Sequence, residues 1–150
     1  MKQKTFYRYV SLISQSALVL MLAFPAIYYT QLPEQIPIHF NFNGQADAYG
    51  AKSNVWTMPI IGLLLYVGLF FINTYLKKKL ENTTKNEYLR AIYINRMLVL
   101  LIALAFCYIS IQTVLVSLNK SDGLGVWFIP VFVLGSIVLP LWPLVMKKKT

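Results

Sequence analysis

Cysteine, histidine and acidic residues are scarce in this chain: it has one cysteine, one histidine and five Asp and Glu residues in total. The lone cysteine, Cys107, cannot form a disulfide within the chain. A metal site needs three or four ligands, and the single histidine, His39, has only the carboxylates of Glu34 and Asp47 near it in the sequence. We therefore expect no metal and no cofactor. No complete catalytic constellation is visible, so we also expect that the protein is not an enzyme.

Charged residues are also few, and their placement excludes several classes of protein. They make up 13% of the chain, against 57% hydrophobic residues, whereas about 25% is usual for soluble domains. The net charge of +9 comes from Lys and Arg at the ends of apolar runs, a pattern that is typical of membrane anchors and not of a nucleic-acid-binding face. No Asp or Glu lies inside an apolar run, which argues against a proton-coupled or cation-coupled transporter.

Four apolar runs account for most of the chain, and each is close to the roughly 20 residues that a helix needs to cross a bilayer. They cover about residues 10–29, 55–76, 92–118 and 126–146. Lipid cannot satisfy exposed backbone groups, so each run must be a helix. The sequence predicts an all-α integral membrane protein, in which residues 1–150 form one domain: a bundle of four transmembrane helices with a short β-hairpin-like loop between the first two.

The orientation of this bundle follows from the positive charges beside each run. Basic residues are concentrated in the leader, in loop 77–90 and at the C-terminus, whereas the other two loops have one each, Lys52 and Lys120. This alternation predicts a multi-pass protein of the cell membrane with both termini in the cytoplasm. The basic loop 77–90 then faces the cytoplasm, where we expect it to contact anionic lipid and where it could bind a cytosolic protein.

The polar stretch 32–54 is expected on the opposite, extracytoplasmic side. Prolines at its start end the first helix, and Asn43-Gly44 is a strong hairpin turn signal. The apolar residues Ile38, Phe40 and Phe42 occupy alternate positions, which is typical of a strand with one buried face. We expect that face to pack on the bundle, with the polar residues of the hairpin exposed.

The same stretch resembles a known family. Its pattern Pro-x-His-Phe-x-x-x-Gly-x-x-Asp, at residues 37–47, is followed by Gly-x-Lys at residues 50–52. This pattern resembles the bacterial membrane domain of unknown function 1648 family, the N-terminal domain of SdpI-type immunity proteins. The resemblance implies a binding or sensing protein, related to immunity against, or signalling of, a membrane-active peptide toxin. Its hypothetical ligand-binding residues are Pro37, His39, Asn41, Gly44, Asp47 and Lys52.

The residues themselves leave alternatives open. His39 could be a general base or a pH sensor, or a hydrogen-bonded histidine that holds the hairpin on the bundle. Asp47 could pair with Lys52 across the hairpin. The ligand could be an extracellular peptide or a lipid-linked molecule. Two other functions are a small oligomeric transporter or channel, and a membrane enzyme that acts on a lipid-linked substrate through His39.

Polar residues also occur within the predicted spans. Gln15, Asn73 and Asn95 lie one to two turns from the cytoplasmic ends of three different helices, so they predict a polar intramembrane cluster. Hydrogen bonding between helices is its simplest role. Arg96, beside Asn95, is near enough to the interface for its side chain to extend toward water.

Overall fold

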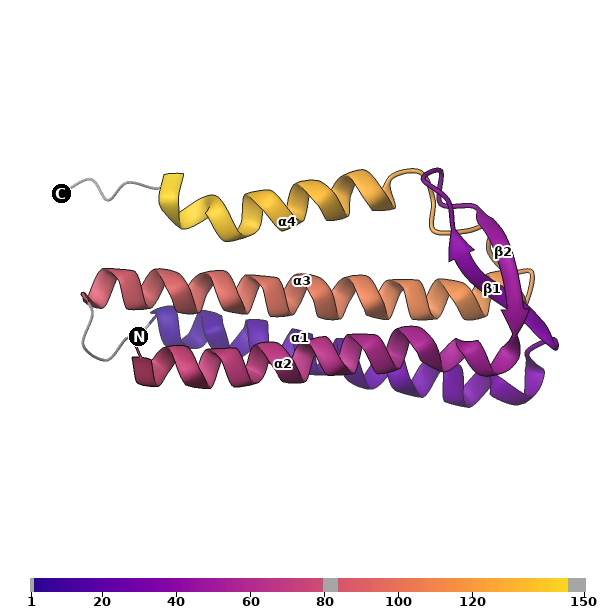
Figure 1. Ribbon diagram of the computed structural model, residues 1–150, viewed down its shortest axis with the longest axis horizontal. Helices are drawn as coiled ribbons and strands as arrows, with labels where there is room; N and C mark the ends of the chain where they lie inside the picture. The colour runs from indigo at the N-terminus through magenta and orange to yellow at the C-terminus, as the bar shows by residue number, and fades with distance from the viewer. Residues whose placement is uncertain (1, 80–83, 146–150) are drawn as a thin grey trace.

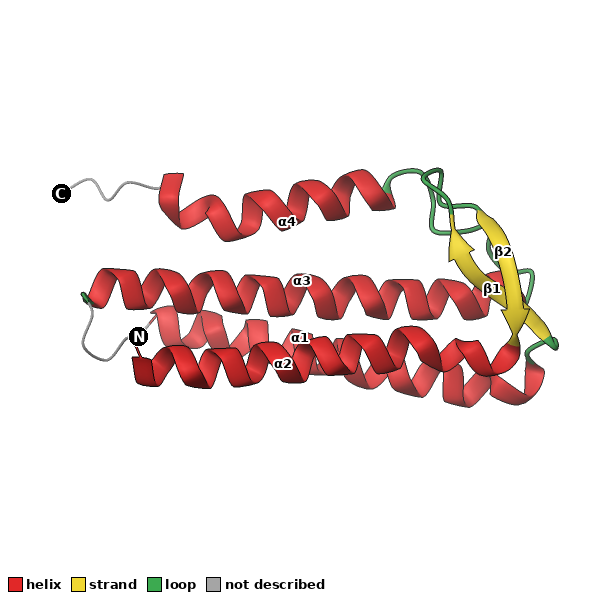
Figure 2. Ribbon diagram, viewed as in Figure 1, coloured by secondary structure: helices red, strands yellow, loops and turns green. Residues whose placement is uncertain are grey.

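The protein is a helical bundle with a two-stranded hairpin across one end (Figures 1 and 2). The computed structural model describes residues 2–79 and 84–145. Its elements, in chain order, are α1 (Lys2–Tyr28), a 3₁₀ helix (Tyr29–Gln31), β1 (Gln35–Phe40), β2 (Ala46–Ala51), a second 3₁₀ helix (Lys52–Trp56), α2 (Thr57–Lys79), α3 (Lys85–Ser117) and α4 (Phe128–Val145).

Three of the helices are long and apolar enough to cross a membrane. Their candidate spans are Thr5–Gln31, Lys52–Ile72 and Glu87–Ser117, and a shorter apolar helix covers Phe128–Trp142. The hairpin between α1 and α2 confirms the predicted strand pair. Two helices begin well before the predicted apolar runs, α1 at Lys2 and α3 at Lys85, whereas α4 lies within the predicted run 126–146. A helix satisfies its own backbone hydrogen bonds, so it does not have to end where the apolar residues end.

The long helix α3 is the centre of the bundle. It packs against α1, α2 and α4, whereas α4 packs mainly against α3. In Figure 1 the start of α1 and the end of α4 lie at the end of the bundle opposite the hairpin. The hairpin therefore lies at the end where α1 leads into β1 and where α3 is joined to α4.

The core between α1, α2 and α3 depends on close approach of the helices. Ala17, Met21 and Cys107 are buried in one cluster there, so the Cys107 side chain contributes packing contacts to the core. Gly62 of α2 lies against this cluster: a Cβ at residue 62 would lie 2.9 Å from the sulfur of Met21 and 3.0 Å from Cβ of Phe106. Gly62 thus lets α2 approach both neighbours.

Replacing Gly62 by valine should therefore weaken the bundle. Overpacking of this kind costs about 1–3 kcal/mol. Gly68→Val is the matched control, because nothing lies within 4 Å of a Cβ at residue 68 of the same helix. Unfolding of the detergent-solubilised protein, followed by circular dichroism, measures the difference. Equal stability of the two variants would show that α2 does not pack closely at Gly62.

Candidate functional site

The hairpin is irregular at the position of its only histidine. In the antiparallel pair, Ile36 lies opposite Gly50 and Pro37 opposite Tyr49, but the register shifts on both sides of His39. Ile36 and Pro37 are buried, which anchors the start of β1 on the helices. A bulge of this kind breaks the simple alternation of side chains.

The predicted buried face of the hairpin is consequently wrong in part. Ile38 is 44% exposed and Phe42, in the turn, is 86% exposed. Only Phe40 of the three expected residues packs against the bundle, beside the cluster that contains Leu124 and Phe128. The sequence pattern could not reveal this, because a register shift at one residue changes the face to which later side chains point.

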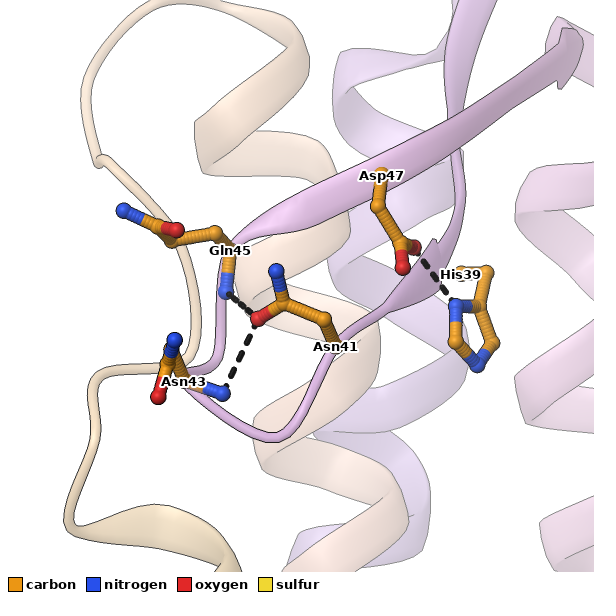
Figure 3. A network of polar contacts seen from close by, with 5 residues as sticks. All are labelled: His39, Asn41, Asn43, Gln45 and Asp47. Atoms are coloured by element: carbon orange, nitrogen blue, oxygen red, sulfur yellow. Dashed lines mark hydrogen bonds and ion pairs between the residues drawn. The ribbon is translucent and has the colours of Figure 1, made fainter.

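The turn is built around Asn41 and Gly44. The backbone N–H of Gly44 donates to the carbonyl of Asn41 at 2.8 Å, and the N–H of Asn41 donates to the carbonyl of Gln45 at 2.8 Å. Gly44 has a φ of +76°, which favours glycine. The side-chain oxygen of Asn41 accepts the N–H groups of Asn43 and Gln45 (Figure 3). The Asn43-Gly44 signal therefore located the turn correctly, and Asn41 has a structural role in closing it.

His39 and Asp47 point toward each other across the two strands (Figure 3), and His39 Nδ1 is 2.6 Å from Asp47 Oδ1. An ionised carboxylate can only accept, so Nδ1–H is the donor and Nε2 remains for another partner. The His39 side chain is 67% exposed and that of Asp47 is 42% exposed. An exposed pair contributes only about 0–1 kcal/mol to stability. Its main effect is to fix the direction of the imidazole ring.

Lys52 pairs with Glu34 and not with Asp47. Its Nζ donates to Glu34 Oε1 at 3.0 Å and lies 5.6 Å from the centre of the Tyr29 ring. The pairing of Asp47 with Lys52, one of the alternatives that the sequence left open, does not form, because Asp47 contacts His39 instead. The Lys52–Glu34 contact joins the end of β2 to the start of β1 and closes the base of the hairpin.

A cavity of about 260 Å³, which we call the His39 groove, lies between the hairpin and the helices. Its polar lining residues are His39, Asn54, Thr57 and Thr113. The rest of its lining is apolar and consists of Pro37, Ile38, Phe40, Val55, Met58, Ile109 and Leu124. The groove is smaller than the roughly 300–1,000 Å³ of pockets for whole small molecules. It can therefore accommodate one apolar group of a larger ligand, beside the histidine.

The tip of the hairpin is fixed to the α3–α4 loop through glycine residues. The N–H of Leu124 donates to the carbonyl of Gly44 at 2.7 Å. A Cβ at residue 44 would lie 2.6 Å from the carbonyl oxygen of Gly125, and one at Gly123 would overlap the carbonyl of Gly44. The backbones of the two loops meet so closely that no other residue type fits at these positions.

A second, largely polar crevice of about 420 Å³ lies beside this contact. Tyr108, Gln112 and Trp127 contribute to its lining, together with residues 43–45 and 121–126. The Tyr108 hydroxyl donates to the carbonyl of Leu124 at 2.8 Å, and Gln112 Nε2 donates to that hydroxyl at 3.0 Å. Tyr108 lies in the middle of the predicted span 92–118, where an aromatic residue gives no signal beyond packing. Trp127 lies at the start of the predicted span 126–146, where a membrane interface explains an aromatic residue equally well.

The predicted site residues therefore fall into two groups. Pro37 and His39 line the groove and Asp47 orients His39, whereas Asn41, Gly44 and Lys52 shape the hairpin and lie outside the groove lining. Among the residues that the structure describes, no group of three His, Cys, Asp or Glu side chains could hold a metal ion.

The predicted polar cluster lies at the other end of the bundle. Gln15 and Asn95 line one cavity there, and Asn95 Nδ2 donates to the carbonyl of Leu69 at 3.3 Å. The side chain of Asn73 lies outside the described part of the chain, as do residues 80–83 of the basic loop 77–90.

Comparisons with known proteins agree with the motif. Residues 17–63 match the family model described as "Domain of unknown function (DUF1648)", which confirms the resemblance of this segment to the domain of unknown function 1648 family. An uncharacterized protein of Archaeoglobus fulgidus is 33% identical over 45 residues, which are 30% of this chain and 25% of that protein. The matched segment is thus about a quarter of that relative's length. No solved structure matches this chain.

The His39–Asp47 contact can be tested by NMR spectroscopy of the histidine ring nitrogens. Because His39 is the only histidine, ¹⁵N-histidine labelling gives one pair of ring signals. At neutral pH the ring nitrogen shifts should report a proton on Nδ1, and Asp47→Asn should move both signals because the carboxylate acceptor is lost. Glu34→Gln, the control, removes a carboxylate that contacts Lys52 instead. Equal spectra for wild type and Asp47→Asn would show that the contact does not form.

Proposed function

We propose, from the DUF1648 match of residues 17–63, that this protein is a four-span protein of the cell membrane that binds an extracytoplasmic peptide at the His39 groove. Three helices are long and apolar enough to span a membrane, and α4 is also apolar. Arg8, Lys78 and Arg90 belong to the helix ends far from the hairpin (Figure 1). Excess positive charge at one end of a bundle supports a cytoplasmic location of that end.

The observation that carries the binding proposal is the fixed histidine at the rim of an apolar groove. His39 Nε2 has no hydrogen-bond partner among the described residues, while Nδ1 is held by Asp47. An apolar cavity with a few oriented polar groups is the usual form of a binding site. His39 can therefore form a hydrogen bond to a ligand whose apolar group enters the groove.

The size of the groove favours a peptide over a small molecule. A cavity of about 260 Å³ suits a single aromatic or branched side chain, which would anchor a longer chain lying across the hairpin. The resemblance to SdpI-type immunity proteins points to the same class, a membrane-active peptide. In this proposal the protein intercepts the peptide at the outer surface of the membrane before it inserts.

The His39–Asp47 pair also favours a second candidate, a membrane enzyme acting on a lipid-linked substrate. A carboxylate that holds the Nδ1–H of a histidine is the arrangement used to orient a general base. The groove offers Thr57 and Thr113 as hydroxyl groups, and the Thr113 hydroxyl already donates to the carbonyl of Ile109 at 2.9 Å. Without an activated nucleophile, binding remains the better supported function.

The topology can be tested by thiol labelling in a Cys107→Ala background. Gln45 and Glu87 are both exposed and lie at opposite ends of the bundle. A membrane-impermeant maleimide should label Gln45→Cys in intact cells and Glu87→Cys only after lysis. The reverse pattern would place the hairpin in the cytoplasm and contradict the proposed binding side.

The binding function can be tested by protection of cells. A sensitive strain producing the wild-type protein is exposed to a panel of membrane-permeabilising bacterial peptides, and entry of an impermeant DNA dye is measured. The protein should reduce dye entry for at least one peptide, and His39→Gln should abolish this protection at equal protein level. Gln35→Ala, an exposed change on the same strand but outside the groove lining, should retain it. Equal dye entry with and without the protein, for every peptide, would contradict the proposal.

A further inference from the structure

Arg96 is a charged residue inside the bundle whose charge has no carboxylate partner in the described part of the chain. Its Nη1 donates to the backbone carbonyl of Tyr7 at 3.1 Å, and its guanidinium carbon lies 4.6 Å from the centre of the Tyr7 ring. Its Nε is buried and has no hydrogen-bond partner. Of the described carboxylates, those of Glu34 and Asp47 form the ion pairs, and both pairs lie in the hairpin region.

An unpaired cation in such a position is costly. Burying a charge away from water is unfavourable unless it is paired and hydrogen-bonded, and arginine cannot lose its proton at physiological pH. The carbonyl and the ring of Tyr7 offset part of this cost through a charge-assisted hydrogen bond and a cation–π contact. Neither carries a full negative charge, so the described residues supply no counterion to the guanidinium.

A cavity of about 160 Å³ lies beside Arg96, between α1, α2 and α3. Its lining also includes the hydroxyl groups or amides of Ser11, Ser14, Gln15, Tyr66 and Asn95. Gln15 is exposed, so the cavity reaches the surface of the bundle. The volume exceeds the space that a single water molecule needs, and the side-chain amides of Gln15 and Asn95 can donate hydrogen bonds to an anion.

The depth of the cavity suits a lipid headgroup. Arg96 lies about 14 Å along α3 from Glu87, at roughly 1.5 Å per residue, and the candidate span Glu87–Ser117 is longer than the roughly 20 residues that the hydrocarbon core requires. Arg96 therefore lies near the boundary between headgroups and hydrocarbon, at the end of the bundle away from the hairpin. A phosphate with acyl chains can enter there from the bilayer.

We propose that this cavity binds the phosphate of an anionic phospholipid, with Arg96 as its charged partner and with Gln15 and Asn95 as hydrogen-bond donors. A planar guanidinium is well suited to phosphate oxygens. The site rests on the proposed membrane location of the protein, but it does not depend on the His39 groove or on its ligand. It gives the predicted polar cluster a role beyond hydrogen bonding between helices.

Native mass spectrometry of the purified, delipidated protein tests this site directly. The protein is mixed with phosphatidylglycerol, with phosphatidylcholine or with inorganic phosphate, and the retained adducts are counted. Wild type should retain one phosphatidylglycerol more strongly than phosphatidylcholine, and Arg96→Gln should lower that retention more than about tenfold, because a buried charged contact is lost. Val99→Phe keeps the arginine but fills the cavity, of which Val99 is a lining residue, and should also lower retention.

Two controls separate this site from general effects. Arg90→Gln removes an exposed arginine of the same helix and should leave retention unchanged, as should His39→Gln, which alters only the groove. Circular dichroism of each variant confirms its helical fold. Undiminished retention by folded Arg96→Gln, or equal retention of the two lipids, would overturn the proposal. A phosphate adduct without a lipid adduct would overturn the assignment to lipid.

Discussion

Polar groups between apolar helices must find partners within the protein, because the apolar side chains around them offer none. Here several hydroxyl groups bond to a nearby carbonyl of their own helix, as Ser14 does to Val10 and Thr113 to Ile109. Ser110 instead donates across the bundle to the carbonyl of Met21 at 3.0 Å, which ties α3 to α1. The buried atoms that remain unpartnered in the described part, Arg96 Nε and Gln112 Oε1, belong to residues that border cavities.

The same constraint explains how the hairpin is held. Two strands alone are marginally stable in water, so this pair depends on Ile36 and Pro37, which are buried against the helices, and on the backbone contact of its tip with Leu124. Both attachments bring the hairpin to α3 or to the loop that follows it. His39 is consequently presented by a strand that is fixed at both ends, which is what a preorganised binding group requires.

The sequence predicted the elements of this fold better than their contacts. Apolar runs located the helices, and Asn43-Gly44 located the turn, because both signals are local. Three features depend on contacts between residues that are distant in the sequence. They are the bulge at His39, the pairing of Lys52 with Glu34 and the approach of Gly123 to Gly44. Of the candidate site, the motif identified His39 and Asp47, but the groove walls Ile109, Thr113 and Leu124 gave no signal, since they resemble any other residues of a span or loop.

The position of Ile109, Thr113 and Leu124 in the chain affects what related proteins can share of this groove. The segment that matches the family model ends at residue 63, so it supplies the histidine, the hairpin and the first turns of α2. The opposite side of the His39 groove comes from the second half of the chain. Proteins that share this segment but continue differently would surround an equivalent imidazole with other side chains. In the proposed binding function, the residue that forms the hydrogen bond to the ligand can thus be inherited separately from the residues that select the ligand.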